Sequence, residues 1–356
     1  MKIVIAASGS RGEVQPYIAL ALALQARGHH VAIATEMRVK PLVEEFKLEY
    51  RHLVGDPTGL LFEPGSQEIL ASGSIMQLMT ISKRWDEQFD RAEILKSYVT
   101  ACEGAELVIG ANLTLTQSFS VSEYLNCPWI PMILGPTLPT REFPLWVFPN
   151  LSCCSCLNKW SYNYLMKMYW NNERSYINPW RTELGLPEIT FPNGVGGVID
   201  TRQPPIIVAC SPMVCGPKRA VPDDYPSNVH MYGWTFVTTD ESVHDTVEPA
   251  LREFVEGAAS AGLPLVYLGF GSMPAPRPEE LLRTALQACV QSECKGVCIA
   301  GWSAMDTEGC RAVLDEARAS GRMFITKSAP HDWLFPRVSC IVHHCGVCSI
   351  SYVDNC

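Results

Sequence analysis

The sequence predicts an α/β protein made of two Rossmann-like domains, and two observations support this fold class. Apolar runs of strand length alternate with helix-like runs along most of the chain, which is typical of a parallel sheet covered on both faces. The 356 residues are also enough for two domains of ordinary size, each with its own core. We therefore expect two stacked α/β domains.

The first expected elements are a strand over Met1–Ala7, a glycine-bearing loop and a helix over Tyr17–Arg27. Strand, loop and helix in that order form the first half of a βαβ unit. The loop therefore lies at the carboxyl edge of a parallel sheet, where open α/β folds bind ligands. Pro16 suits the first helical turn, and Gly28 follows the last helical residue as a C-cap does.

The loop before this helix does not carry the dinucleotide-binding fingerprint. Gly9 and Gly12 are three residues apart, and Val14 occupies the position of the next glycine. An NAD-linked oxidoreductase is therefore only a low-ranking alternative. The side chains of Arg11 and Glu13 are expected to project from the turn.

Further runs continue the alternation of strands and helices. In chain order they are His30–Thr35, Val39–Lys47, Leu107–Ala111, Thr116–Leu125, Trp129–Leu134, Pro204–Cys210, Val229–Trp234, Glu248–Gly262, Leu263–Phe270, Pro278–Ser292, Gly296–Ala300, Asp306–Ser320, Met323–Lys327 and Cys340–His344. The polar stretch Thr235–Asp245 has no apolar period and is the best linker candidate. The sequence thus predicts a first domain over 1–234, a linker over 235–247 and a second domain over 248–356.

The segment Phe143–Trp180 is dense in aromatic residues. Leu157, Trp160, Tyr164, Met168 and Trp170–Asn171 partly fit a helical stripe, which favours a helix that packs this stripe on the sheet. The alternative is a surface that lines an apolar cleft or rests on a membrane.

Composition excludes several classes of protein. The chain carries 28 basic and 37 acidic residues, a net charge of -9, with no basic block that would bind nucleic acid. No apolar stretch reaches the roughly 18 residues of a membrane span, so we expect a cytoplasmic protein with peripheral membrane contact at most. The 15 cysteines are irregularly spaced. Buried free thiols are therefore favoured over disulfides or a zinc site, and we expect no metal.

Several motifs occur in a fixed order along the chain. They are Gly9–Pro16 with the following helix and Gly28–Thr35, then Tyr232–Trp234, Val266–Met273, Ala329–Pro336 and Ile341–His344. Together they resemble the UDP-glycosyltransferase family that contains the sterol 3-beta-glucosyltransferases and the antibiotic glycosyltransferases.

The resemblance implies a GT-B fold, in which the first domain holds the acceptor and the second holds the nucleotide sugar. It also implies inverting transfer of glucose from UDP-glucose to a sterol or another lipophilic alcohol, without a cofactor or a metal. An alcohol is a poor nucleophile until its proton is being removed, so the reaction needs a base. Glu13 stands where the family usually has Asp and is the candidate base, with Ser10, Arg11 and Gly12 as its loop neighbours.

The family motifs also indicate donor-binding residues, for which backbone N–H groups, hydroxyls and an imidazole would neutralise the diphosphate. These residues are Gly271, Ser272, Trp302, His331, Trp333, His344, Gly346 and Ser349. Structural alternatives stay open at this point. Glu13 would pair with Arg11 or cap the helix, and Trp333 would belong to a helical turn in the core.

The chain departs from the family pattern near its end. Cys345–Ile350 replaces the family's Gly-Gly-Ala-Gly-Thr-Thr, and the sequence stops at Cys356. We therefore expect an incomplete, C-terminally truncated second domain and no strong transferase activity. The alternative function is a non-catalytic acceptor-binding module, or a subunit completed by another chain.

Overall fold

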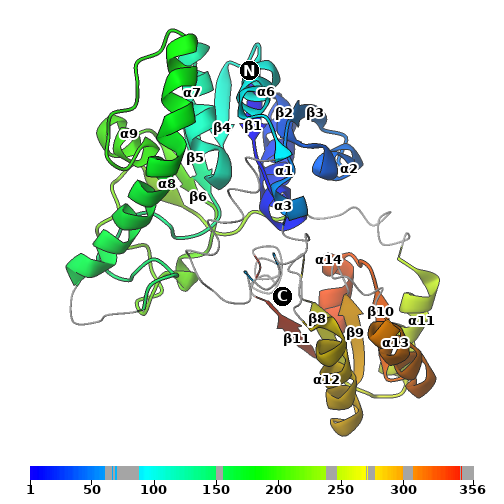
Figure 1. The fold of residues 1–356 in the computed structure, drawn as a ribbon. Coiled ribbons are helices and arrows are strands. Elements are labelled where there is room, and N and C mark those ends of the chain that lie inside the picture. The colour runs from blue at the N-terminus through cyan, green and yellow to red at the C-terminus, as the bar shows by residue number, and fades with distance from the viewer. Residues whose placement is uncertain are drawn as a thin grey trace. The chain divides into compact units, whose positions relative to one another are not determined.

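The computed structural model describes residues 1–60, 66, 69, 88–149, 155–237, 247–269, 271, 277–299, 308–344 and 346. The chain divides into two compact units, Met1–Pro57 with Trp85–Thr235 and Thr58–Arg84 with Phe236–Cys356. Figure 1 shows that each unit contains strands with helices packed around them. Most of the expected linker, residues 238–246, lies outside the described residues.

The first unit alternates strands and helices as the sequence predicted. Its elements are β1 (Lys2–Ala6), α1 (Arg11–Ala26), β2 (His30–Glu36), η1 (Met37–Val39), α2 (Lys40–Glu45), β3 (Glu49–Leu53), α6 (Arg91–Cys102), β4 (Leu107–Gly110), η2 (Asn112–Thr114), α7 (Leu115–Tyr124), β5 (Trp129–Ile133), α8 (Ser155–Glu183), α9 (Val195–Arg202), β6 (Ile206–Val208), η3 (Pro212–Val214) and β7 (Val229–Met231). The short helix α3 (Pro57–Leu60) lies at the sequence boundary between the units.

The strands of the first unit form one parallel sheet in the order β3-β2-β1-β4-β5-β6-β7. Its first six strands have the order of a doubly wound nucleotide-binding fold, in which the direction of the crossovers reverses between β1 and β4. Because β1 and β2 are central, their side chains are buried almost continuously, and Ile5 and Ile33 are 0% exposed. The prediction of an α/β fold with a parallel sheet is confirmed.

The second unit repeats this topology with fewer strands. Its elements are α11 (Pro249–Ser260), β8 (Leu265–Gly269), α12 (Pro278–Gln291), β9 (Lys295–Ile299), α13 (Glu308–Ser320), β10 (Met323–Thr326), α14 (His331–Leu334), η4 (Phe335–Arg337) and β11 (Cys340–His343). Four parallel strands run in the order β10-β9-β8-β11, so here the crossovers reverse between β8 and β11. Both units are Rossmann-like in their described parts.

Helix α8 corrects the prediction for the aromatic segment. The helix exists, but only the end of the predicted stripe faces the core: Leu157, Trp160 and Tyr164 are 41%, 51% and 46% exposed, whereas Trp170 is 5% exposed. The buried face instead carries polar and aromatic residues together: Asn158, Ser161, Tyr162, Trp170, Ile177, Trp180 and Arg181. The hydropathy pattern predicted the wrong buried face, because polar side chains of α8 are buried with hydrogen-bond partners. The Ser161 hydroxyl, for example, accepts the backbone N–H of Leu145 at 2.9 Å.

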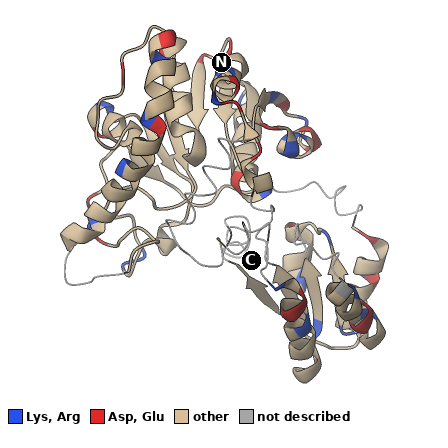
Figure 2. Cartoon of the chain, in the orientation of Figure 1, with Lys and Arg blue, Asp and Glu red and all other residues tan. Residues whose placement is uncertain are grey.

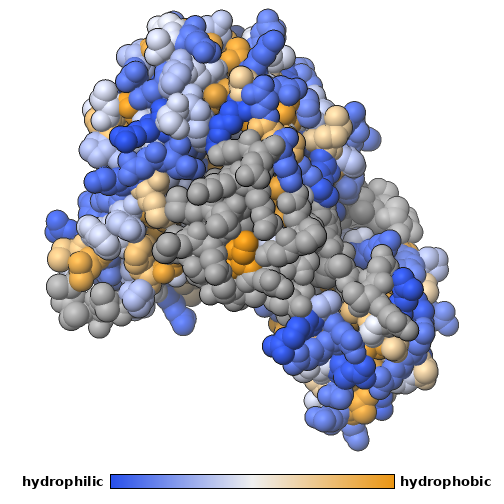
Figure 3. Space-filling view, in the orientation of Figure 1, coloured by the Kyte–Doolittle hydropathy of each residue, from blue (hydrophilic) through white to orange (hydrophobic). Residues whose placement is uncertain are grey.

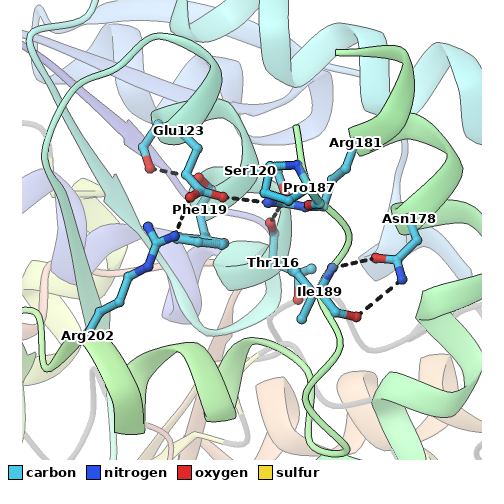
Figure 4. Close-up of polar contacts among 10 residues, drawn as sticks. Thr116, Phe119, Ser120, Glu123, Asn178, Arg181, Pro187, Ile189 and Arg202 are labelled. Atoms are coloured by element: carbon cyan, nitrogen blue, oxygen red, sulfur yellow. Dashed lines mark hydrogen bonds and ion pairs between the residues drawn. The ribbon is translucent and has the colours of Figure 1, made fainter. Parts of the chain in front are cut away.

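A buried charge network fixes α8 to its neighbours (Figure 4). The Arg181 side chain is 2% exposed and donates to Glu123 of α7 at 2.5 Å and to the hydroxyl of Ser120 at 2.9 Å. Arg202 of α9 bonds the other oxygen of the same carboxylate at 2.5 Å. Both guanidinium groups also lie over the ring of Phe119. One carboxylate therefore ties three helices together.

Arg181→Met should destabilise the first unit strongly. It leaves Glu123 largely buried without its inner partner, and breaking a buried pair in this way costs about 3–5 kcal/mol. Arg202→Met is the matched control, because Arg202 is 56% exposed and its pair with Glu123 is expected to contribute about 1 kcal/mol at most. Denaturant unfolding of both variants measures the difference. Equal losses would contradict the network as described.

Candidate functional site

The loop after β1 lies at the point of the first sheet where the crossovers reverse. The backbone N–H of Ala111, after β4, donates to the carbonyl of Ala6 at 3.0 Å, and the Thr114 hydroxyl donates to the same carbonyl at 2.7 Å. These bonds hold the ends of β1 and β4 together. The loop over residues 7–10 therefore begins at the crevice position of a doubly wound fold.

The structure corrects the predicted start of the first helix. Helix α1 begins at Arg11 with Ser10 as its N-cap, so Gly12 and Glu13 belong to the first helical turn rather than to a loop. Pro16 is accordingly the sixth helical residue. The reason is a reciprocal cap: the Glu13 carboxylate accepts the N–H of Ser10 at 2.6 Å, which fixes the helix start upstream of the proline. The predicted C-cap is confirmed, since Gly28 follows Arg27 with φ 84°.

The structure distinguishes the two structural alternatives for Glu13, an ion pair with Arg11 and a cap on the helix. Arg11 donates through Nε to Gln15 at 2.9 Å, and the Glu13 carboxylate caps the helix. Gly9 makes this possible, because its φ is 122° and a Cβ at that position would overlap the Glu13 carboxylate. Glu13 itself is exposed. Its assignment as a base stays a prediction.

A second carboxylate, which sequence reasoning missed, lies at the same loop. Glu36 is the last residue of β2 and is 4% exposed. Its carboxylate accepts the Ser8 hydroxyl, the Gly9 N–H at 3.3 Å and the Thr35 hydroxyl at 3.1 Å. Burial raises the pKa of Glu36 to about 6, although these hydrogen bonds oppose the shift. The sequence signal that could have revealed it is a carboxylate at the end of an otherwise apolar strand.

The two carboxylates decide what this loop can bind. Consecutive backbone amides of Gly9 and Ser10 point at Glu36 and Glu13, in the place where a nucleotide-binding loop would hold phosphate. Negative charge already fills the start of α1. A diphosphate at this point would meet two carboxylates, so the loop of the first unit is unsuited to bind one.

The second unit brings three of the predicted donor residues together. Gly271 follows β8 and His344 follows β11, and these strands pair so that His343 lies opposite Gly269. A Cβ on Gly271 or on Gly346 would overlap the imidazole ring of His344. The cluster therefore lies where the crossovers of this sheet reverse, and glycine is required on both sides of the ring.

The imidazole of His344 lies in surroundings that disfavour its charged form. Burial lowers its pKa, and this effect outweighs the opposing hydrogen bond with the backbone of Gly269. Its Nδ1 atom is buried and finds no hydrogen-bond partner among the described residues. The ring is therefore mainly neutral at pH 7, and binding of an anion to it would require uptake of a proton.

The remaining donor predictions have mixed outcomes. His331 is held by Tyr267 at 3.1 Å and stacks on Phe335 at 4.6 Å, so its ring is already engaged. Trp333 is 1% exposed, with Arg252 over its ring at 5.4 Å and Arg337 at 4.9 Å. Its faces are covered, which contradicts stacking on a base and supports the alternative of a core residue. Ser272, Trp302 and Ser349 lie outside the described residues.

The described part of the chain contains no group of three or more metal-ligating side chains. Lys and Arg are scattered among Asp and Glu rather than gathered on one face (Figure 2). Among the described helices, none is both long and apolar enough to cross a bilayer.

Comparison with known proteins agrees with this architecture. Residues 3–140 match the glycosyltransferase family 28 N-terminal domain. Sterol 3-beta-glucosyltransferase of Komagataella phaffii is 29% identical over 97% of this chain and 27% of its own length. The same enzyme of Cryptococcus neoformans var. neoformans serotype D is 29% identical over 97% of this chain and 22% of its own length. The chain thus spans about a quarter of the length of these relatives.

Solved structures share the fold. The glycotransferase of kitacinnamycin aligns with a TM-score of 0.63 at 15% identity, covering 99% of this chain and 77% of that one. The calicheamicin glycosyltransferase CalG4 aligns with a TM-score of 0.58 at 15% identity, covering 99% and 76%. Two doubly wound units with these neighbours show that the chain has a GT-B fold. The family match over residues 3–140 and the curated relatives show further that the chain is similar to glycosyltransferases, among them the sterol 3-beta-glucosyltransferases.

Substitution at two glycines tests the geometry of the first loop. Gly9→Ala and Gly28→Ala both place a Cβ at positive φ, 122° and 84°, which costs about 1–2 kcal/mol. Only Gly9→Ala also overlaps the Glu13 carboxylate, whereas nothing lies within 4 Å at Gly28. We expect Gly9→Ala to lose about 1 kcal/mol more in unfolding free energy, the value of a helix cap. Equal losses would show that Glu13 does not occupy this position in solution.

Proposed function

We propose that this chain acts in the inverting transfer of glucose from UDP-glucose to the hydroxyl of a sterol or another lipophilic alcohol. The observation that carries the proposal is the pair of clusters at the two points of crossover reversal. The first has an exposed carboxylate, Glu13, and the second has a neutral imidazole, His344, between glycines. The names of the curated relatives support the sterol and the glucose.

In the proposed step, the acceptor oxygen forms a bond to the anomeric carbon as its proton passes to Glu13. The bond from that carbon to the diphosphate oxygen breaks, and UDP leaves with the electron pair. Inversion follows because the acceptor attacks from the face opposite the leaving group. No cofactor or metal is needed in this scheme, since His344 and backbone N–H groups would stabilise the diphosphate.

A non-catalytic acceptor-binding module is the second candidate, and two observations favour it. The Glu13 carboxylate is already accounted for as a helix cap, with Ser10 at 2.6 Å. Trp333, expected at the nucleotide base, lies in the core of the second unit. Under this reading the chain binds a sterol but shows no affinity for UDP-glucose.

A lipophilic acceptor also requires access to membranes, and we propose peripheral contact of a cytoplasmic chain. Trp160 and Tyr164 stack at 4.9 Å between ring centroids, and Phe148 packs edge-on against both. Trp146 is 79% exposed nearby in sequence. Figure 3 shows hydrophobic surface where α8 begins, at the lower left of the view.

The charges of the same stretch favour an anionic bilayer as the occupant of this surface. Residues 146–172 contain Lys159 and Lys167 and no carboxylate, although the whole chain has a net charge of -9. Aromatic side chains with flanking lysines are typical of proteins that bind at the membrane–water interface. The surface is therefore more compatible with lipid headgroups than with an acidic protein partner.

Glu13→Gln should abolish sugar transfer and leave the fold intact. The amide oxygen can still accept the Ser10 N–H, but it cannot take up the acceptor proton, so we expect turnover to fall about 10²–10⁴-fold. Glu13→Asp is the control that keeps the carboxylate. The measurement is transfer from labelled UDP-glucose to a sterol panel.

Near-normal turnover of Glu13→Gln would overturn the assignment of the base. If the unmodified chain binds a sterol and does not bind UDP-glucose, the non-catalytic alternative replaces the transferase. Transfer to polar acceptors alone would remove the sterol from the proposal.

Binding of UDP-glucose should tighten as the pH falls from 7.5 to 6. The pKa of His344 is lowered in the free chain, and a bound diphosphate would favour the imidazolium, so binding takes up a proton. The expected gain is at most about tenfold per pH unit. Calorimetry in buffers of different ionisation enthalpy measures the proton uptake.

His344→Gln should lose this pH dependence, whereas His343→Gln, the neighbouring residue on β11, should keep it. A dependence that persists in His344→Gln would assign the proton to another group.

Replacing Trp160 and Tyr164 by serine should weaken sedimentation with vesicles of mixed neutral and anionic phospholipid by at least about tenfold, because two interfacial aromatic anchors are lost. Tyr232→Ala is the control, since Tyr232 is 87% exposed in the same unit but far along the chain. Analytical ultracentrifugation without lipid checks for self-association. Unchanged vesicle binding, or a dimer that the double variant abolishes, would contradict the membrane assignment.

A further inference from the structure

Glu36 is a carboxylate that the proposed transfer step does not use. It ends β2 and is 4% exposed, and among the described residues its side-chain hydrogen bonds go to hydroxyl and amide groups: the side chains of Ser8 and Thr35 and the N–H of Gly9. Within the described part of the chain, no Lys, Arg or His side chain forms an ion pair with it. Two tyrosines face it, Tyr50 of β3 and Tyr98 of α6, and after burial the Glu36 charge contributes to raising the pKa of both.

Such a group is costly to bury. A carboxylate without a cation loses hydration that neutral hydrogen bonds replace only in part. An apolar residue would avoid this cost, but it could not accept hydrogen bonds from the neighbouring loop. Here two of the three partners, Ser8 and Gly9, belong to the loop between β1 and α1, and the third is the residue beside Glu36.

We propose that Glu36 is a positioning residue that holds the loop of Ser8 and Gly9 and thereby fixes Glu13 for its task. The effect on Glu13 rests on the proposed function, whereas the hold on the loop does not. One peptide unit connects the two carboxylates: the Gly9 N–H bonds Glu36, and the next N–H, of Ser10, bonds Glu13 at 2.6 Å.

The coupling follows from backbone geometry. Gly9 has φ 122°, a conformation open to glycine among many others, and a Cβ there would meet the Glu13 carboxylate. If Glu36 releases the Gly9 N–H, the loop can rotate about this residue. The Ser10 N–H then turns away from Glu13, and the carboxylate loses its fixed orientation.

The hold is pH-dependent. Burial raises the pKa of Glu36 to about 6, so the ionised form that accepts bonds through both oxygens prevails above this pH. Below it, one oxygen carries a proton and the bond from Gly9 weakens. The hydrogen bonds of Ser8 and Gly9 lower the pKa of Glu36, so their release from a carboxylate that stays buried would raise it further. Protonation therefore favours release of the loop, and loop order should decrease as the pH falls through about 6.

Amide hydrogen exchange at single residues tests the proposal without any substrate. At pH 7.5, Glu36→Gln should lower the protection factor of Gly9 at least about tenfold, because the amide group replaces a charged acceptor by a neutral one. Glu106→Gln is the matched control: Glu106 accepts the N–H of Lys2 at 2.7 Å at the opposite end of β1. It should leave Gly9 unchanged.

The pH dependence of the Gly9 amide resonance gives a second test, which distinguishes a titrating carboxylate from a residue that only fills space. In the unmodified chain, the Gly9 amide resonance should titrate with a midpoint near the pKa of Glu36, about 6, and in Glu36→Gln it should not. Ser8→Ala should raise the midpoint, because the Ser8 hydroxyl favours the ionised form. If Glu36→Gln does not fold, the shift of the midpoint in Ser8→Ala tests the proposal in its place.

Transfer kinetics complete the test. Glu36→Gln should lower kcat at least about tenfold at pH 7.5 with the KM for UDP-glucose within about twofold, since donor binding is not altered. A Gly9 midpoint that survives in Glu36→Gln, or unchanged protection, overturns the proposal. If the exchange and titration results hold but no variant transfers glucose, Glu36 still positions the loop and the transferase proposal fails instead.

Discussion

The reversal of strand order within each sheet is the constraint on which the rest of the structure depends. Consecutive right-handed crossovers move outward from a central strand, so the two connections beside it leave in opposite directions and open a crevice at the carboxyl ends. In the first unit this point lies between β1 and β4, and in the second between β8 and β11. Both candidate clusters lie there because backbone topology leaves those strand ends uncovered.

The two points of reversal differ in charge. The first carries the carboxylates of Glu13 and Glu36, which occupy the amides that would otherwise attract phosphate. The second carries a neutral imidazole, His344, flanked by Gly271 and Gly346. An acid-rich loop can accept a proton from an alcohol and repels a diphosphate, whereas the imidazole and glycine backbone suit an anion. The same topology thus supports two complementary binding chemistries.

Sequence patterns predicted the strands and the glycine clusters well, because both depend on local residue choice. The start of α1 was wrong because the proline signal was preferred over Ser10 and Glu13, whose three-residue spacing is a capping box. Helix α9 was not predicted, since Gly196 and Gly197 argue against a helix in isolation. Glu36 was missed because its burial depends on a loop 27 residues earlier. Long-range burial is what the sequence alone does not display.

Capping and proton transfer need not exclude each other at Glu13, because a carboxylate has two oxygens. Oε2 accepts the Ser10 N–H at 2.6 Å, and within the described residues Oε1 accepts no hydrogen bond. A base held by one oxygen has a defined direction for the other, which is the geometric requirement of proton transfer. The additional methylene of Glu relative to Asp allows the side chain to reach back to the helix start while one oxygen stays exposed. The cap is therefore a means of orientation, and the buried Glu36 behind it supplies the rigidity that such orientation requires.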